Sequence, residues 1–195
     1  MDLDTRIFLA VNAFARATPW LHSLVTGYAN YGVVLFAALM IAGWWTARTT
    51  ADPAPMAAAL WTPLAALLAL GINQPIADAV GRTRPCNALH DIVVLHCNTD
   101  PGLPSDHAVL AGAATAGLWL VSRRLGTITA IATIAMAFTR IYIGAHYPGD
   151  VLAGIGLGAV ATLAGYALAR PLLQRAITAL ARTPARLLVR QGSWT

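Results

Sequence analysis

The sequence predicts an all-α protein, a polytopic membrane helical bundle of about five to six transmembrane helices with an N-terminal interfacial helix. Composition is the first observation: 57% of the 195 residues are hydrophobic and only 11% are charged, well below the quarter that is usual in soluble chains. The second is that the apolar residues form several runs long enough to cross a bilayer. A chain of this length is expected to form a single integral-membrane domain, residues 1–195.

The first expected element is the interfacial helix within residues 1–17. One face of a helix with a period of 3.6 residues would carry Leu3, Ile7, Ala10, Val11 and Phe14, whereas the arginines of this segment lie elsewhere. The segment is too short to cross a membrane, which takes about 20 residues. An amphipathic helix lying in the membrane surface is therefore expected.

Five apolar segments that follow are interpreted as crossings. They are residues 19–46, 56–81, 106–122, 126–145 and 149–169. The first contains Asn30 and Gly32 near its middle, which would allow two shorter helices, but we expect one crossing. Gly154 and Gly158 in the last have the spacing of small residues that lets membrane helices pack closely. Residues 170–195 are expected to form a cytoplasmic tail, amphipathic or flexible.

The charge of the chain comes from 13 arginines and 8 aspartates, with no lysine or glutamate, for a net charge of +5. We interpret the arginines as residues that flank membrane segments, so no nucleic-acid partner is expected. The loop 86–103 contains two cysteines and two histidines, but their spacing matches no common zinc pattern. No metal is predicted. A disulfide between Cys86 and Cys97 is expected if the loop faces an oxidising compartment.

Polar residues of special interest lie between the last two apolar segments, in residues 139–150. Arg140 offers a forked donor suited to phosphate oxygens. Pro148 suits the first turn of a helix, so Asp150 would lie in that turn, just after His146. A carboxylate there could hold one imidazole nitrogen as N–H and leave the other as a nucleophile. The alternative is that Asp150 only caps the helix.

Two earlier fragments carry similar side chains. They are Arg82-Thr83-Arg84-Pro85 and Pro104-Ser105-Asp106-His107. The second begins an apolar helix that Ser105 or Asp106 could cap, which places it at a natural anion site. Asn73 and Gln74 precede the first fragment, and they are expected either to hydrogen-bond between helices or to belong to the site.

Together the three fragments resemble the type 2 phosphatidic acid phosphatase superfamily, and among its branches the undecaprenyl pyrophosphate phosphatases associated with bacitracin resistance. The resemblance implies a metal-independent lipid phosphatase without a cofactor. His146 would attack phosphorus to give a phosphohistidine, Asp150 would orient it, and His107 would protonate the leaving group. Arg84, Arg140 and Ser105 would bind the phosphate.

The sequence departs from the family pattern at three positions. Ala77 stands where the family has a lysine, Thr139 replaces a serine, and Asp106 replaces a glycine. The lost positive charge could be replaced by Arg82 or by hydrogen bonds from Asn73 and Gln74, so these are also candidate substrate-binding residues. Asp106 is counted with them, although it is expected to point away from phosphate, toward Arg82 or solvent.

The five crossings place all three fragments on one side of the membrane and most other arginines on the opposite side. The positive-inside rule then predicts that the site faces outward from the cell membrane. The expected reaction is hydrolysis of undecaprenyl diphosphate to the monophosphate. The alternatives are phosphatidic acid, phosphatidylglycerophosphate or another polyprenyl phosphate as substrate, transfer to an acceptor other than water, and a binder or transporter without turnover. Membrane lipids are the expected partners, and no oligomeric state is predicted.

Overall fold

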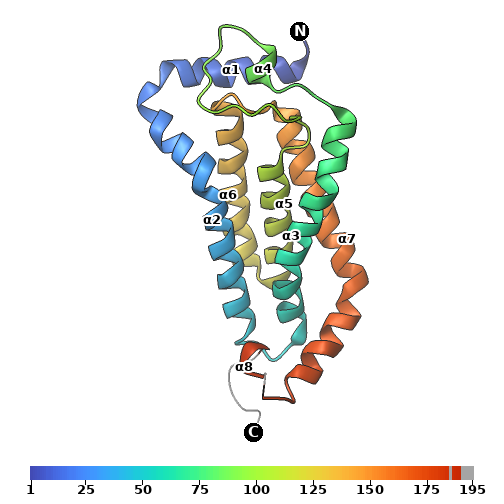
Figure 1. Cartoon of the computed structure of the whole chain (residues 1–195). Coiled ribbons are helices and arrows are strands. Elements are labelled where there is room, and N and C mark those ends of the chain that lie inside the picture. Colours follow the sequence, from blue (N-terminus) through green and yellow to red (C-terminus); the bar gives the residue numbers. More distant parts are fainter. Residues whose placement is uncertain (185, 190–195) are drawn as a thin grey trace.

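The structure is a computed structural model and describes residues 1–184 and 186–189. Five long helices run side by side, and a further helix lies across one end of them (Figure 1). The five are α2 (His22–Ala47), α3 (Pro53–Val80), α5 (Asp106–Val121), α6 (Arg123–Tyr142) and α7 (Pro148–Leu180). The helix that lies across their end is α1 (Leu3–Ala17). The remaining elements are single turns: η1 (Pro19–Leu21), α4 (Pro85–Ala88) and α8 (Arg186–Val189). The described residues contain no strand, and the predicted all-α bundle is confirmed.

The bundle helices have the composition of membrane segments. Four apolar stretches are long enough to cross a membrane: Pro19–Ala47, Pro53–Ala88, Arg123–Tyr142 and Pro148–Leu180. Helix α5 is also apolar but has 16 residues, about 24 Å of helix against a hydrocarbon core of about 30 Å. It packs against α2, α3, α6 and α7 in the centre of the bundle, so protein covers much of its surface. The chain is a multi-pass membrane protein.

Helix α1 is capped by Asp2, whose carboxylate accepts a hydrogen bond from Thr5 N (2.7 Å). It buries Phe8, Asn12 and Ala15 against the rest of the protein. Most residues of the predicted apolar face remain exposed, namely Leu3, Ile7, Ala10 and Phe14, whereas Val11 is partly buried against the protein. This second face is available to lipid, as expected for a helix at a membrane surface.

Helix α2 is one unbroken helix through Asn30 and Gly32, which confirms the single crossing. Gly32 is buried because α2 approaches α6 closely there: a methyl group at this position would lie 2.6 Å from Cε of Met136. The glycine therefore serves packing rather than a break in the helix.

Helix α7 continues to Leu180, well beyond the end predicted at residue 169. The additional turns are stabilised by packing, since Ile177 is buried in one cluster with Met56 of α3 and Leu173 contacts the same cluster. The start of the predicted tail is thus helix, despite Pro171. Beyond α7 the chain folds back to α2, where Trp44 Nε1 donates to Leu188 O (2.9 Å). Arg190 lies outside the described residues.

Helices α5 and α7 pack closely against each other, as the glycine spacing in α7 predicts. A methyl group at Gly158 would lie 2.0 Å from Val109 O, and one at Gly154 would lie 2.6 Å from Ser105 O. The first residues of α5 and α7 are consequently side by side, and Ser105 N donates to Asp150 O (3.1 Å). This packing brings two of the polar fragments together.

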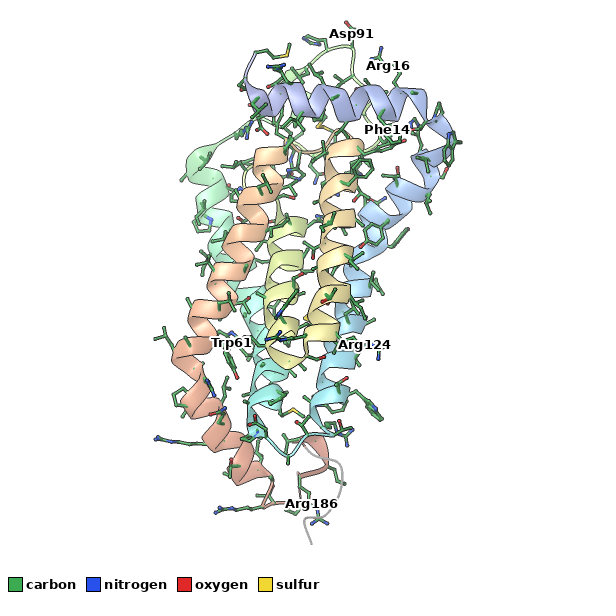
Figure 2. The ribbon with its side chains drawn as sticks, turned by 180° about the vertical axis from the view of Figure 1, so that it is seen from behind. Phe14, Arg16, Trp61, Asp91, Arg124 and Arg186 are labelled. Carbon is green, nitrogen blue, oxygen red and sulfur yellow. A yellow bond between two sulfur atoms is a disulfide. The ribbon has the colours of Figure 1, made fainter. Side chains whose placement is uncertain are left out.

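The loop between α3 and α5 lies against α1 at the same end of the bundle. The amide of Asn12 donates to Val93 O (2.7 Å) and accepts from Val93 N (2.9 Å). Further along, the Arg16 guanidinium donates to the carbonyl of Asp91, and Figure 2 shows both residues at this end. The structure joins Cys86 to Cys97 in a disulfide, which closes the loop.

Candidate active site

Figure 1 shows α1 lying across one end of the bundle. Hydrogen bonds and ion pairs join many of the predicted polar residues at this end. They come from the α3–α5 connection, the start of α5, the last turn of α6, and the α6–α7 turn with the start of α7. Several are almost completely buried, with exposed fractions of 5% for Arg84, 2% for Arg140 and 1% for His146. A buried charge requires a partner or a ligand, so the hydrogen bonds of these groups define what the site can do.

His146 is held in one orientation by its surroundings. Its Nδ1 lies 2.9 Å from the carbonyl oxygen of Gly102, which can only accept a hydrogen bond, so Nδ1 carries the proton. Its Nε2 then has the lone pair and accepts from Arg84 Nη1 (2.6 Å). Burial lowers the pKa of His146 below its ordinary value of 6.5, which favours the neutral ring. Nε2 is therefore the candidate nucleophile.

Asp150 is close to His146 but does not hold it as predicted. Its Oδ2 lies 3.6 Å from His146 Nδ1, beyond hydrogen-bond length, and accepts instead from Tyr147 N (2.9 Å). Its Oδ1 accepts from Arg82 Nη1 (2.8 Å). The Nδ1–H group of His146, which was expected to donate to Asp150, donates to Gly102 O instead. The Asp150 carboxylate accepts from the backbone N–H of Tyr147 at the start of α7. At 3.6 Å its charge still favours an imidazolium.

Arg84 is fixed by a residue that the sequence patterns missed. Its Nε donates to Asp100 O (2.9 Å), and its Nη2 donates to the Asp100 carboxylate and to Pro101 O (3.2 Å). Asp100 belongs to no recognised fragment, and its side chain is half exposed. A forked guanidinium held from one side presents its remaining N–H groups in a fixed direction. In Arg84 these include Nη1, which points at His146.

Arg140 and Ser105 have unused donors. Within the described part of the chain, the Arg140 guanidinium has no hydrogen-bond partner, and its Nε is buried. Ser105 Oγ is also buried without a partner among the described residues. Although Ser105 is the N-cap residue of α5, its side chain makes no capping bond there. The expected cap is therefore absent. Buried donors without partners are costly in a protein, and an anion would satisfy them.

His107 is the second residue of α5 and is partly buried. Its ring has no hydrogen-bond partner among the described residues, and it is within electrostatic reach of Arg84, Arg140 and His146. The first-turn N–H groups of α5 beside it lack acceptors within the helix. Ser105 N is not among these donors, since it is bonded to Asp150 O. The ring is thus free to exchange a proton with a bound ligand.

Asp106 points neither to Arg82 nor to solvent, contrary to the prediction. Its Oδ1 accepts from Asn73 Nδ2 (2.6 Å) and Gln74 Nε2 (3.0 Å), and Asn73 also donates to Pro104 O (3.2 Å). These bonds join α3 to the start of α5, because two amides from α3 satisfy the carboxylate. The structure therefore uses Asn73, Gln74 and Asp106 between helices rather than bringing their donors to the phosphate-binding groups.

Arg82 is also engaged elsewhere. Its Nη1 binds Asp150 and its Nη2 binds Asp4 Oδ2 (2.6 Å), a residue of α1 that no sequence pattern had indicated. Ala77, at the position of the family lysine, is buried. Arg82 is thus paired with two carboxylates and does not serve as a free donor in place of that lysine.

The arrangement has the parts needed for phosphoryl transfer. A neutral imidazole offers Nε2 as nucleophile, two buried arginines and a buried hydroxyl offer donors for phosphate oxygens, and a second histidine can carry the leaving group's proton. The site lies at the end of membrane-crossing helices, where a lipid headgroup can reach it. These features are those of a membrane-bound phosphatase.

Comparison with known proteins agrees with this class. The model of the PAP2 superfamily matches residues 58–173, more than half of the chain. The undecaprenyl-diphosphatase BcrC of Bacillus subtilis is 26% identical over 153 residues, which cover 78% of this chain and 77% of BcrC. The lipid A 1-phosphatase of Rhizobium johnstonii is 26% identical over 154 residues, 71% of this chain and 63% of that protein. The chain belongs to the PAP2 superfamily.

The fold is that of solved members. The transmembrane PAP2-type phosphatidylglycerolphosphate phosphatase of Bacillus subtilis superposes with a TM-score of 0.61 at 21% identity, over 86% of this chain and 88% of that one. The predicted resemblance is confirmed at the level of the superfamily, and the BcrC match is consistent with the predicted branch.

Proposed function

We propose that this protein hydrolyses undecaprenyl diphosphate to the monophosphate at the outer face of the cell membrane, through a phosphohistidine on His146. That the chain is a phosphatase of lipid phosphates follows from its superfamily and its homologues. The observation that carries the mechanism is the hydrogen bonding of His146, with Nδ1 on Gly102 O and Nε2 facing Arg84.

In the first step Nε2 of His146 attacks the terminal phosphorus, and the bond to the bridging oxygen breaks. A phosphate that binds Arg84 takes Nη1 away from Nε2, which frees the lone pair for attack. Arg84, Arg140 and Ser105 donate to the non-bridging oxygens, where charge develops. His107 gives its proton to the leaving lipid monophosphate.

In the second step water attacks the phosphohistidine and inorganic phosphate leaves. His107, now neutral, takes a proton from that water, so the ring returns to its starting state. Asp150, 3.6 Å from Nδ1, stabilises the positive charge that the ring carries while phosphorylated. Two arginines provide the positive charge that a metal ion supplies in other phosphoryl-transfer sites, so we expect no metal requirement.

The choice of substrate is supported by the named relatives. BcrC and a further homologue from Sulfolobus acidocaldarius are undecaprenyl-diphosphatases. The lipid A 1-phosphatase and the phosphatidylglycerolphosphate phosphatase are the reason to keep other lipid phosphates as a second candidate.

The outward orientation is supported by the arginines at the other end of the bundle. Figure 2 shows Arg124 and Arg186 toward the end opposite α1, and the exposed arginines of this end follow the positive-inside rule. The disulfide between Cys86 and Cys97, at the end that carries the site, suits an oxidising compartment.

The test is phosphate release by purified protein in detergent with excess chelator. Undecaprenyl diphosphate and phosphatidic acid are compared as substrates, with His146→Ala as the control. Release from the diphosphate that the variant lacks supports the proposal. Release from phosphatidic acid alone keeps the mechanism and excludes the substrate. A folded wild-type protein that is silent on both supports a binding or transport function instead.

A further inference from the structure

A carboxylate on the interfacial helix α1 reaches into the surroundings of the site. Asp4 Oδ1 accepts from Gly149 N in the first turn of α7 (2.7 Å), and Asp4 Oδ2 accepts from Arg82 Nη2 (2.6 Å). The contact is close, because a methyl group at Gly149 would lie 2.9 Å from that carboxylate. These bonds join the beginning of the chain to residues 78 and 145 positions away.

Arg82 is held on three sides. Asp4 binds one end nitrogen and Asp150 binds the other, at 2.6 and 2.8 Å. The guanidinium also lies over the ring of Tyr147, 4.4 Å from its centre, an attractive contact for a cation. Phe8, also from α1, packs its edge against the same Tyr147 ring at 5.4 Å. Helix α1 thus contributes both a charge and an aromatic ring to one cluster.

Two routes lead from Arg82 to the nucleophile. Through its side chain, Arg82 fixes Asp150, which bonds to Tyr147 N and lies 3.6 Å from His146 Nδ1. Through its backbone, Arg82 O accepts from Gly102 N (2.8 Å), and Gly102 O accepts from His146 Nδ1 (2.9 Å). Both groups that face Nδ1 therefore depend on where Arg82 lies.

We propose that Asp4 is a positioning residue for His146. Helix α1 then helps to orient the nucleophile, in addition to lying at the membrane surface. Asp4 holds Arg82 against Asp150 and holds the first turn of α7, and these contacts set the direction of Nε2. The inference rests on the proposed function. Asp4 has no contact with Arg84, Arg140 or Ser105, so it affects the chemical step rather than phosphate binding.

The test compares two carboxylates of the same helix. Asp4→Asn removes the charge that binds Arg82, whereas Asp2→Asn changes an exposed residue whose carboxylate, among the described residues, is hydrogen-bonded only to Thr5. We expect Asp4→Asn to lower kcat by about 10- to 100-fold, the range that a small misplacement of a reacting group produces, with KM and the melting temperature nearly unchanged. Asp4→Glu should recover part of the loss, and Asp2→Asn should behave like wild type.

A double-mutant cycle with Arg82→Gln tests the route. If Asp4 acts through Arg82, adding Asp4→Asn to Arg82→Gln costs little more than Arg82→Gln alone. Multiplied losses would overturn this route. An unchanged kcat in Asp4→Asn, or a loss confined to KM, would overturn the positioning role.

A second readout does not depend on turnover. In protein labelled with ¹⁵N-histidine, the ring nitrogens of His146, assigned from the signals lost in His146→Gln, should shift in Asp4→Asn and not in Asp2→Asn. A wild-type protein without phosphatase activity would defeat the proposed function and still allow this measurement. Unshifted His146 signals in Asp4→Asn would defeat the present proposal while leaving the phosphatase in place.

Discussion

The arginines at the two ends of the bundle differ in their burial and in their partners. At the end covered by α1, Arg84 and Arg140 are buried and Arg82 is paired with two carboxylates. At the other end the described arginines lie mostly at the surface: Arg123, Arg124, Arg170, Arg175, Arg182 and Arg186 are exposed. Exposed cations near a membrane influence topology, whereas buried cations need an anion. Burial, rather than the count of arginines, therefore separates the two uses.

The sharpest test of this difference is the side of the membrane on which each end lies. In a background without Cys86 and Cys97, a cysteine is introduced by His90→Cys at the site end or by Arg182→Cys at the other. A maleimide that cannot cross membranes should label the first in intact cells and the second only after lysis. This result is close to all or none, because the bilayer separates the two compartments. The opposite pattern would reverse the proposed orientation.

A matched pair of arginine variants at opposite ends of α6 tests the chemistry. Arg140→Gln removes a buried donor that has no hydrogen-bond partner in the described part of the chain, so kcat/KM should fall by about 10²- to 10³-fold, the usual loss for one donor to a developing charge. Arg124→Gln changes an exposed residue at the far end and should leave kcat/KM unchanged. Both are measured by phosphate release with folding checked by thermal denaturation. Equal losses would show that burial does not distinguish the two arginines.

The pH dependence of kcat/KM tests the surroundings of the nucleophile. Burial lowers the pKa of His146, and only the neutral ring can attack, so the acid-side loss of kcat/KM that reports this ring should lie below pH 6.5. The loss therefore lies on the acid side, at a midpoint under the ordinary histidine value. A midpoint above 6.5 would mean that the charge of Asp150 outweighs burial.

The bundle could largely be predicted, since apolar runs report crossings directly. The clear miss is the end of α7. Arg170 and Pro171 look like the end of a membrane helix, but the packing of Ile177 against Met56 continues it to Leu180. Such packing joins residues far apart in the chain, so local sequence carries no sign of it.

The site could be predicted only in part. His107, Arg140 and His146 carry recognisable chemistry at recognisable spacing, and the structure brings them together. The residues around them could not be found from the sequence in this way. Gly102 binds His146 through its backbone carbonyl, and Asp4 binds Arg82 from the distant helix α1. Asp106 was placed wrongly because its partners lie on α3. Tertiary contacts decide these positions.

The smallest expected effect is that of Asp100→Asn, which tests how Arg84 is held in the site. The Asp100 carboxylate is bound to Arg84 and is half exposed, so it competes with phosphate for the same guanidinium. Asp100→Asn keeps an oxygen acceptor for Nη2 but removes the negative charge, and Arg84 remains held by the carbonyls of residues 100 and 101. Inorganic phosphate should then inhibit at about two- to five-fold lower concentration, a size typical of one partly exposed charge pair.

The matched control is Asp91→Asn, a change in the same loop at a residue that is bonded to Arg16 only through its backbone. Weaker inhibition by phosphate in Asp100→Asn would mean that the carboxylate orients Arg84 for the substrate rather than competing with it.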